Sequence, residues 1–268
     1  LEFITGNRNH YAMMKPGGVR RDIPADDIPA VVGLMGRLKA PLEMLRDAIA
    51  DDPLIHARTK GVGVLTREQV IDYCALGPTA RASGVAIDVR KDHPHAAYDR
   101  VDWEMVLGEK GDVYDKIMVR IGEMFQSIRI IEQCLERLKT VPGPIDSNPR
   151  QVPPGEGIGH YEAPRGEVFH YVRSDGGNRP IRHKVRAPSF MNVITDREAV
   201  IGHTIADAAI ILAAVDPCYC CTERIAVYDA QRGTRISGAA ALIRASQRKT
   251  EQLRRKLGWA GPVLKLED

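Results

Sequence analysis

Two cysteines spaced as Cys-x-x-Cys, Cys218 and Cys221, form the pattern in this chain that is best suited to chemistry. A tight turn at this spacing points both sulfurs the same way, so that two thiolates grip one soft metal ion. The pair is half of a four-thiolate shell, and the chain holds no second Cys-x-x-Cys and no suitably spaced histidine pair. A zinc knuckle and a buried pair of thiols stay open as alternatives. Asp216, two residues before the first thiolate, is placed to accept a hydrogen bond beside a metal.

The remaining cysteines and histidines carry weaker signals. Cys220 lies between the two candidate ligands and is interpreted as a spectator thiol, whereas Cys74 and Cys134 fall on expected helices and are interpreted as core residues. Histidines without metal-like spacing are expected in loops or on the surface: His10, His93, His95 and His203. Five cysteines, three of them within four residues, argue against a disulfide framework and favour metal or redox chemistry in a reducing compartment.

Composition indicates a globular chain of 268 residues with 27% charged residues and a formal net charge of +3. The longest apolar runs, such as 208–215, are far shorter than the roughly 20 residues that span a bilayer. The segment after Arg224 holds nine Lys or Arg and four Asp or Glu, so it carries +5 and the remainder carries −2. We interpret this basic segment as a solvated helix face, and we expect no nucleic-acid partner because aromatic residues do not interleave with its charges.

The elements that must position these residues are expected to be mainly helical. Residues 112–138 carry an unbroken apolar stripe at helical spacing, and a second long helix is expected from Asp26 or Asp27 to about Ala50, with a kink or a lost turn at Pro41. A capping box, Thr66 with Gln69, opens a shorter helix. Further short helices are expected over 189–214, and a basic helix over about 237–256.

The non-helical elements are expected to be few. Alternating residues 167–173, the turn 174–177 and the returning run 181–185 predict an antiparallel hairpin. Short strands are expected at 62–65 and 225–228, and the segments 1–23, 76–90 and 142–159 are expected to be loops or linkers. The predicted fold class is therefore mainly α, a helical bundle with a small antiparallel β-hairpin.

The cysteine motif also carries a family resemblance. The stretch Asp216-Pro217-Cys218-x-x-Cys221-Thr222-Glu223-Arg224 resembles the C-terminal nickel motif of the large subunit of nickel–iron (NiFe) hydrogenases. Arginine at the last position resembles group 4, the energy-converting, membrane-bound enzymes of the Ech, CO-induced and formate-hydrogenlyase types.

Other stretches extend the resemblance over nearly the whole chain. Residues 162–167 and 184–190 resemble the strand entry and return of the hydrogenase family. A loop resembles one shared with the quinone-site core subunit of respiratory complex I, through Pro78, Arg81-Ala82-Ser83-Gly84, Asp88, Arg90 and Tyr98. The helix around residues 120–123 matches both relatives.

The resemblance implies a role for each residue of the site. Cys218 would be a terminal nickel thiolate, and Cys221 would bridge nickel and an iron that carries cyanide and carbon monoxide. Arg165 would stand over the metals as a cationic fork or as a base near bound hydrogen, and Ser189 would donate a hydrogen bond to a cyanide. Asp216 would orient Arg165. Without the motif, a structural salt bridge is the preferred interpretation of Arg165.

The resemblance further implies reversible H2 oxidation and proton reduction on the cytoplasmic side of the cell membrane, in a peripheral subunit. The implied partners are a small subunit with a 4Fe-4S cluster, membrane ion-translocating subunits, and nickel-insertion and endopeptidase maturation factors. We expect a large-subunit domain over 1–224 and a maturation extension over 225–268, cleaved after Arg224. We also expect an N-terminal truncation, with the family's first Cys-x-x-Cys pair before Leu1.

Two alternatives from other functional classes stay open. A complex I-like subunit would bind quinone or serve as a scaffold without a metal centre. A non-catalytic binding module would fold only with its partners. Metal analysis discriminates them from a hydrogenase subunit.

Overall fold

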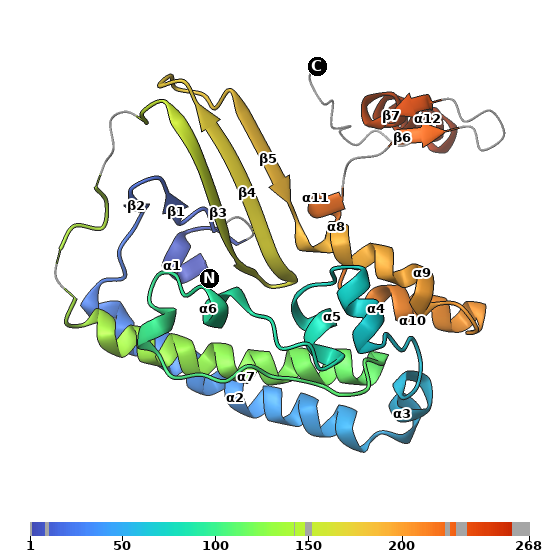
Figure 1. Cartoon of the computed structure of the whole chain (residues 1–268), viewed down its shortest axis with the longest axis horizontal. Helices are drawn as coiled ribbons and strands as arrows, with labels where there is room; N and C mark the ends of the chain where they lie inside the picture. The colour runs from blue at the N-terminus through green and yellow to red at the C-terminus, as the bar shows by residue number, and fades with distance from the viewer. Residues whose placement is uncertain are drawn as a thin grey trace. The chain divides into compact units, whose positions relative to one another are not determined.

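The computed structural model describes residues 2–8, 11–141, 143–147, 152–222, 226–228 and 235–258. The chain divides into two compact units, a large unit of residues 1–217 and a small unit of residues 218–268. The large unit is mainly helical and contains a small antiparallel sheet (Figure 1). The predicted class is confirmed at this level, and the predicted boundary at residue 224 stays a prediction.

Two long helices, α2 (Ile28–Asp51) and α7 (Val113–Leu138), run side by side along the large unit (Figure 1). Both predictions are confirmed, and buried Ile28 and Val31 of α2 pack with Leu135 of α7. Asp112 caps α7 by accepting a hydrogen bond from the amide of Asp115 at 2.8 Å. The helix α2 continues through Pro41, so it does not end at this residue, and the predicted kink stays a prediction. Pro41 is exposed, so water can satisfy the carbonyl that the ring leaves without a donor.

Short elements precede and follow the first long helix. The chain begins with α1 (Glu2–Thr5) and strands β1 (Met14–Lys15) and β2 (Gly18–Val19), where a loop was predicted over 1–23, and the 3-10 helix η1 (Ala25–Asp27) leads into α2. After α2 come α3 (Pro53–Thr59) and α4 (Arg67–Asp72), and the predicted capping box of Thr66 and Gln69 is present.

Two sequence predictions fail between α3 and α7. Residues 62–65 form no strand, although backbone hydrogen bonds join Leu65 to Gly111 and Val113 to Val62. The predicted loop 76–90 contains α5 (Gly77–Ala82) and α6 (Val89–Asp92), followed by the 3-10 helix η2 (Tyr98–Arg100). All six residues of α5 are buried, so tertiary packing stabilises a segment whose composition favours a loop.

The sheet has three antiparallel strands in the order β3 (Gly155–Ala163), β4 (Gly166–Ser174) and β5 (Arg182–Arg186). The predicted hairpin is β4 and β5 and is confirmed. Strand β3 falls partly in the predicted linker 142–159. Its glycines at 155, 157 and 159 lower its strand propensity, but it pairs with β4 along its whole length, from Gly155 opposite Ser174 to Ala163 opposite Gly166.

The large unit ends in the predicted run of short helices. These are α8 (Pro188–Asn192), the 3-10 helix η3 (Val193–Thr195), α9 (Asp196–Ala199) and α10 (Ile205–Ala214). A second capping box, formed by Thr204 and Asp207, starts α10. The main core joins this region to α4, α5 and α7 through buried Leu65, Val70, Ala80, Val113 and Ile211.

The small unit contains α11 (Tyr219–Thr222), the two-stranded sheet of β6 (Ala226–Tyr228) and β7 (Arg235–Gly238), and α12 (Ala239–Leu257). The predicted short strand and basic helix are confirmed within a few residues. Among the described residues, no helix combines the length and the apolar composition that crossing a bilayer requires.

Candidate functional site

Arg165 lies in the tight turn between β3 and β4, where Ala163 pairs with Gly166. Gly166 has φ +125°, and a Cβ there would come within 2.7 Å of the Gly77 amide nitrogen. A Cβ on Gly77, which has φ +62°, would meet the Arg165 carbonyl oxygen at 2.5 Å. The two glycines therefore let the N-terminus of α5 touch the hairpin turn, which fixes the backbone that carries Arg165.

Asn192 of α8 holds the same turn from the other side. Its Nδ2 donates to the carbonyl oxygens of Arg165 and Leu76, each at 3.1 Å, and its Oδ1 accepts from the Leu76 amide at 2.8 Å. The side chain is 1% exposed and uses both its donors and its acceptor. The sequence analysis did not predict a role for Asn192. The feature that could have indicated it is a polar amide side chain three residues after Ser189, on the same predicted short helix.

The guanidinium of Arg165 contacts Asp216 twice. Nε donates to the Asp216 backbone oxygen at 2.7 Å, and Nη2 donates to Oδ1 at 3.0 Å. Asp216 has φ +55°, a left-handed conformation that is unusual for a residue with a side chain and that ends α10. The structure thus brings together the two residues that the resemblance had paired. Their contact has the geometry of a salt bridge, and it fixes the direction of the Arg165 guanidinium.

Ser189 lies on α8, one turn before Asn192, and its side chain is fully buried. Pro188 occupies the first turn of this helix, where its missing amide proton costs nothing. The serine is therefore carried by the same short helix that holds the Arg165 turn. Its predicted role as a donor to cyanide stays a prediction.

Cys218 and Cys221 belong to the small unit, where Cys218 directly precedes the single turn α11 and Cys221 lies within it. The Cys221 amide donates to the Cys218 carbonyl at 3.0 Å, and the Thr222 hydroxyl donates to the same carbonyl at 3.2 Å. Both cysteines are half-buried, whereas Cys220 between them is exposed. This hydrogen-bonded turn suits two soft donors for one metal ion. No group of three or more His, Cys, Asp or Glu side chains in the part of the chain described here is arranged to hold a metal. The two thiols therefore suit a soft metal and could supply two of its ligands.

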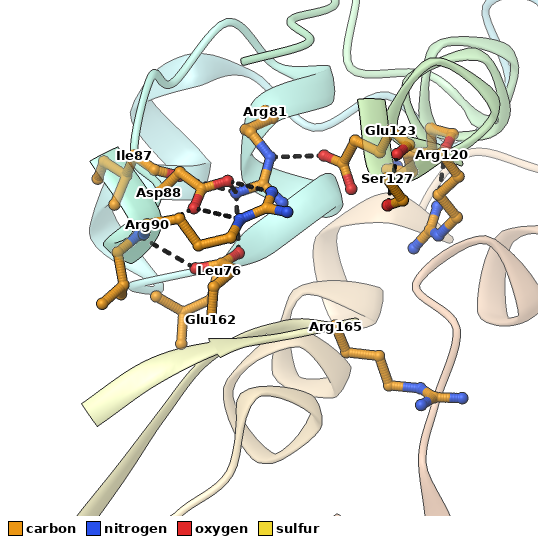
Figure 2. Close-up of polar contacts among 12 residues, drawn as sticks. Leu76, Arg81, Ile87, Asp88, Arg90, Arg120, Glu123, Ser127, Glu162 and Arg165 are labelled. Atoms are coloured by element: carbon orange, nitrogen blue, oxygen red, sulfur yellow. Dashed lines mark hydrogen bonds and ion pairs between the residues drawn. The ribbon is translucent and has the colours of Figure 1, made fainter. Parts of the chain in front are cut away.

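A buried ionic cluster lies beside the Arg165 turn (Figure 2). Arg81 of α5, 1% exposed, donates through Nε to Glu123 Oε1 at 2.7 Å and through Nη1 to Glu162 Oε1 at 2.9 Å. Nη1 also lies 3.2 Å from Asp88 Oδ2, and Arg90 donates twice to that carboxylate. We refer to these five residues as the Arg81 cluster. In Figure 2 the Arg165 side chain extends away from it.

Ion pairing in the Arg81 cluster favours the charge on its central arginine. Burial opposes the charge on Arg81, but the carboxylates of Glu123, Glu162 and Asp88 outweigh it and raise the pKa of this guanidinium. Burial likewise raises the pKa of Glu162, although Arg81 acts in the other direction. The cluster ties α5, α6, α7 and β3 together. Arg81, Arg90 and Asp88 belong to the loop that resembles one in the complex I subunit. The sequence did not reveal that Glu123 and Glu162 pair with Arg81, because these residues come from distant segments.

One face of α7 continues the charged region. Burial lowers the pKa of Arg120, which also experiences the charges of Asp216 and Arg165. Lys116, one turn earlier and 1% exposed, donates to the Gly63 carbonyl at 2.7 Å. Burial, followed by the charge of Arg120, lowers the pKa of Lys116 to about 8, and burial raises the pKa of nearby Asp196 to about 7. Sequence reasoning had assigned this face of α7 to no function.

The other cysteines and histidines divide into confirmed and wrong predictions. Cys134 is half-buried against Trp103 and its neighbours, as predicted for a core residue, but Cys74 is exposed and has φ +51° just after α4. His203 lies in a turn, where its Nε2 accepts from the Gly63 amide at 3.2 Å. His93 and His95 lie beside the sheet, with His93 5.1 Å from His160 between ring centres. His10, Glu223 and Arg224 lie outside the described residues.

Sequence comparison identifies the class of protein. The profile of the family described as "Respiratory-chain NADH dehydrogenase, 49 Kd subunit" matches residues 1–151 and 145–224. The chain therefore belongs to this family, which confirms the resemblance to both of its branches.

Individual relatives come from hydrogenases and from NADH-quinone oxidoreductases. The carbon monoxide-induced hydrogenase of Rhodospirillum rubrum is 42% identical over 83% of this chain and 62% of its own length. Membrane-bound hydrogenase subunit alpha of Pyrococcus furiosus is 38% identical over 85% of this chain and 57% of its own. NADH-quinone oxidoreductase subunit 4 of Thermus thermophilus is 37% identical over 81% of this chain and 59% of its own. The chain thus spans about three fifths of the length of the curated relatives it matches.

Proposed function

We propose that this chain is part of the catalytic subunit of an energy-converting, membrane-bound NiFe hydrogenase, an oxidoreductase that acts on H2. The observation that carries the proposal is the junction at Asp216. This residue accepts two hydrogen bonds from Arg165, and Cys218 and Cys221 follow it directly on a hydrogen-bonded turn. Similarity to a carbon monoxide-induced hydrogenase and to a membrane-bound hydrogenase subunit supports it.

In this proposal the thiolates of Cys218 and Cys221 hold nickel and an iron that carries cyanide and carbon monoxide. When bound, such a centre supplies reversible two-electron chemistry on H2. Two cysteines fill half of a four-thiolate shell, so the other two thiolates would come from outside the described residues. Soft sulfur donors select this kind of metal over magnesium or calcium.

The chain's own residues then set the surroundings of the metals. Arg165 is held in one direction because Asp216 accepts hydrogen bonds from both its Nε and its Nη2. The α5 N-terminus and Asn192 hold the backbone of Arg165, so that little reorganisation would be needed when an anionic ligand approaches the guanidinium. Ser189, buried on the helix of Asn192, would donate to a cyanide.

The partners follow from the same proposal. Electrons would leave through a 4Fe-4S cluster in a small subunit, and membrane subunits would couple the reaction to ion transport. The chain would then be a peripheral subunit on the cytoplasmic side of the membrane. Nickel-insertion factors and an endopeptidase would complete the site.

A complex I-like subunit is the second candidate. The family profile itself describes an NADH dehydrogenase subunit, and a quinone oxidoreductase subunit is 37% identical. Such a subunit would bind quinone or serve as a scaffold, and the Arg81 cluster would then support a purely structural or quinone-facing role. It would need no metal at Cys218 and Cys221.

Metal content and activity of the isolated complex separate the two candidates. We expect nickel and iron by elemental mass spectrometry and H2-dependent reduction of a viologen dye, both lost in Cys221→Ser. Cys220→Ser is the matched control, because this exposed neighbour lies on the same turn and should leave both readouts unchanged. Full H2 activity in Cys221→Ser would refute the hydrogenase, and quinone reduction by a nickel-free complex would establish the alternative.

A further inference from the structure

Two histidines of the three-stranded sheet lie in contact with each other. Both are far from the cysteine motif in the sequence. His170 lies on β4 and His183 on β5, and the register pairs His170 with Val185 and Val172 with His183. The two residues are therefore diagonal neighbours on one face of the sheet. His170 Nδ1 lies 2.9 Å from His183 Nε2, and the rings are stacked with a centroid separation of 5.2 Å.

We propose that His170 and His183 form a binding site for a late first-row divalent transition-metal ion, with Ni2+ as the probe. This site is separate from Cys218 and Cys221 and independent of the proposed hydrogenase function.

The distance between the two nitrogens suits joint coordination. A metal–imidazole bond is about 2.0 to 2.1 Å long, so two cis ligands at a right angle lie about 2.9 Å apart. The nitrogens already have this separation in the absence of a metal. Coordination replaces the hydrogen bond between the rings, and the donor imidazole moves its proton to its other nitrogen while a small ring rotation directs both lone pairs to the ion.

The surroundings favour the neutral form of His170 and leave the pair accessible. Burial, and then the facing His183, hold the pKa of His170 below its usual value, so a lone pair is available at neutral pH. His183 is exposed, which leaves room for water to complete the coordination sphere. Arg182 and Lys184 alternate to the opposite face of β5, so their charges do not point at the pair.

Neighbouring rings limit the rotation of His170. The ring of Tyr161 on β3 stacks on it with an interplanar angle of 11° and a centroid separation of 6.2 Å. Cross-strand pairing on both sides of β4 holds the three side chains on one surface. Preorganised imidazoles prefer Zn2+, Ni2+ and Cu2+ over the hard ions Mg2+ and Ca2+.

The test uses the full chain with Cys218→Ser and Cys221→Ser, so that thiolate binding does not mask the histidine site. Calorimetric titration with Ni2+ should show one site, which weakens about tenfold or more in His170→Gln and in His183→Gln. His160→Gln is the matched control, because His160 lies on the other face of the sheet, where it contacts Glu167. Paramagnetic broadening of imidazole NMR signals should select His170 and His183.

Three results would overturn the site: no Ni2+ binding in the background with Cys218→Ser and Cys221→Ser, equal affinity in His183→Gln, or loss of binding in His160→Gln. Circular dichroism of each variant checks that the fold is retained. Failure here leaves the hydrogenase proposal intact, because that proposal depends on the loss of nickel and H2 activity in Cys221→Ser.

Discussion

Arg165 donates both to the backbone carbonyl and to the carboxylate of Asp216, at 2.7 and 3.0 Å, across 51 positions of sequence. The two contacts use two nitrogens on one edge of the guanidinium, Nε and Nη2, and fix its direction as well as its distance. If the hydrogenase proposal holds, a change in this pair should lower H2 activity more than it lowers the free energy of unfolding.

We expect Arg165→Lys to reduce H2-dependent dye reduction by about tenfold to a hundredfold, because an ammonium cannot reproduce the two-pronged contact. The free energy of unfolding should change by less than about 1 kcal/mol, since the arginine is 31% exposed and Asp216 is 42% exposed. Arg173→Lys, which alters the exposed contact with Glu156, is the control. Wild-type activity in Arg165→Lys would exclude a directed role for the guanidinium.

Asn192→Ala should destabilise the large unit by about 3 kcal/mol, because it leaves three backbone groups of Leu76 and Arg165 without their partner in a buried position. Chemical denaturation measures this change. The exposed Asn178→Ala is the control and should cost less than about 0.5 kcal/mol. Equal denaturation midpoints for the two variants would contradict the role of Asn192 in holding the Arg165 turn.

Removing Arg81 should be the most damaging change in the ionic cluster. Arg81→Met leaves the carboxylates of Asp88, Glu123 and Glu162 without their shared cation, and we expect a loss of about 3 to 5 kcal/mol or failure to fold. The control is Arg129→Met, whose ion pair with Asp102 is exposed and should contribute about 1 kcal/mol or less. If Arg81→Met does not fold, Glu123→Gln offers a milder change that keeps the shape of the side chain.

Stability should depend on pH through Asp196, which is 7% exposed and whose Oδ1 has no hydrogen-bond partner among the described residues. Burial raises its pKa to about 7, so the folded protein binds a proton that the unfolded chain releases near pH 4. The contribution of Asp196 is therefore full below about pH 4 and is lost as the pH rises towards 7. Asp196→Asn should flatten the unfolding free energy over this window, and an unchanged slope would contradict the assignment.

If the hydrogenase proposal holds, the active complex should contain this subunit ending at Arg224. Nickel insertion would precede cleavage of the bond to Ile225, so the mature mass should lack the segment 225–268. Intact mass spectrometry of the purified active complex gives the result directly. An active subunit that still ends at Asp268 would refute a maturation extension.

Local patterns predicted the elements whose stability is local. The apolar stripe of α7 and the capping box at Thr66 can both be recognised within one helix or one turn, and the structure has each of them. Strand β3 and helix α5 were missed for the opposite reason. Glycine-rich β3 is stabilised by its pairing with β4, and α5 by its complete burial.

The sequence by itself determined the family and the residues of the cysteine motif, because spacing along the chain is enough to identify them. Only the tertiary structure decided that Asn192 holds the Arg165 turn, that Glu123 and Glu162 share Arg81, and that His170 meets His183. Each of these contacts joins different elements, and directional hydrogen bonds form only after packing has brought the elements together. No pattern of neighbouring residues encodes such a contact.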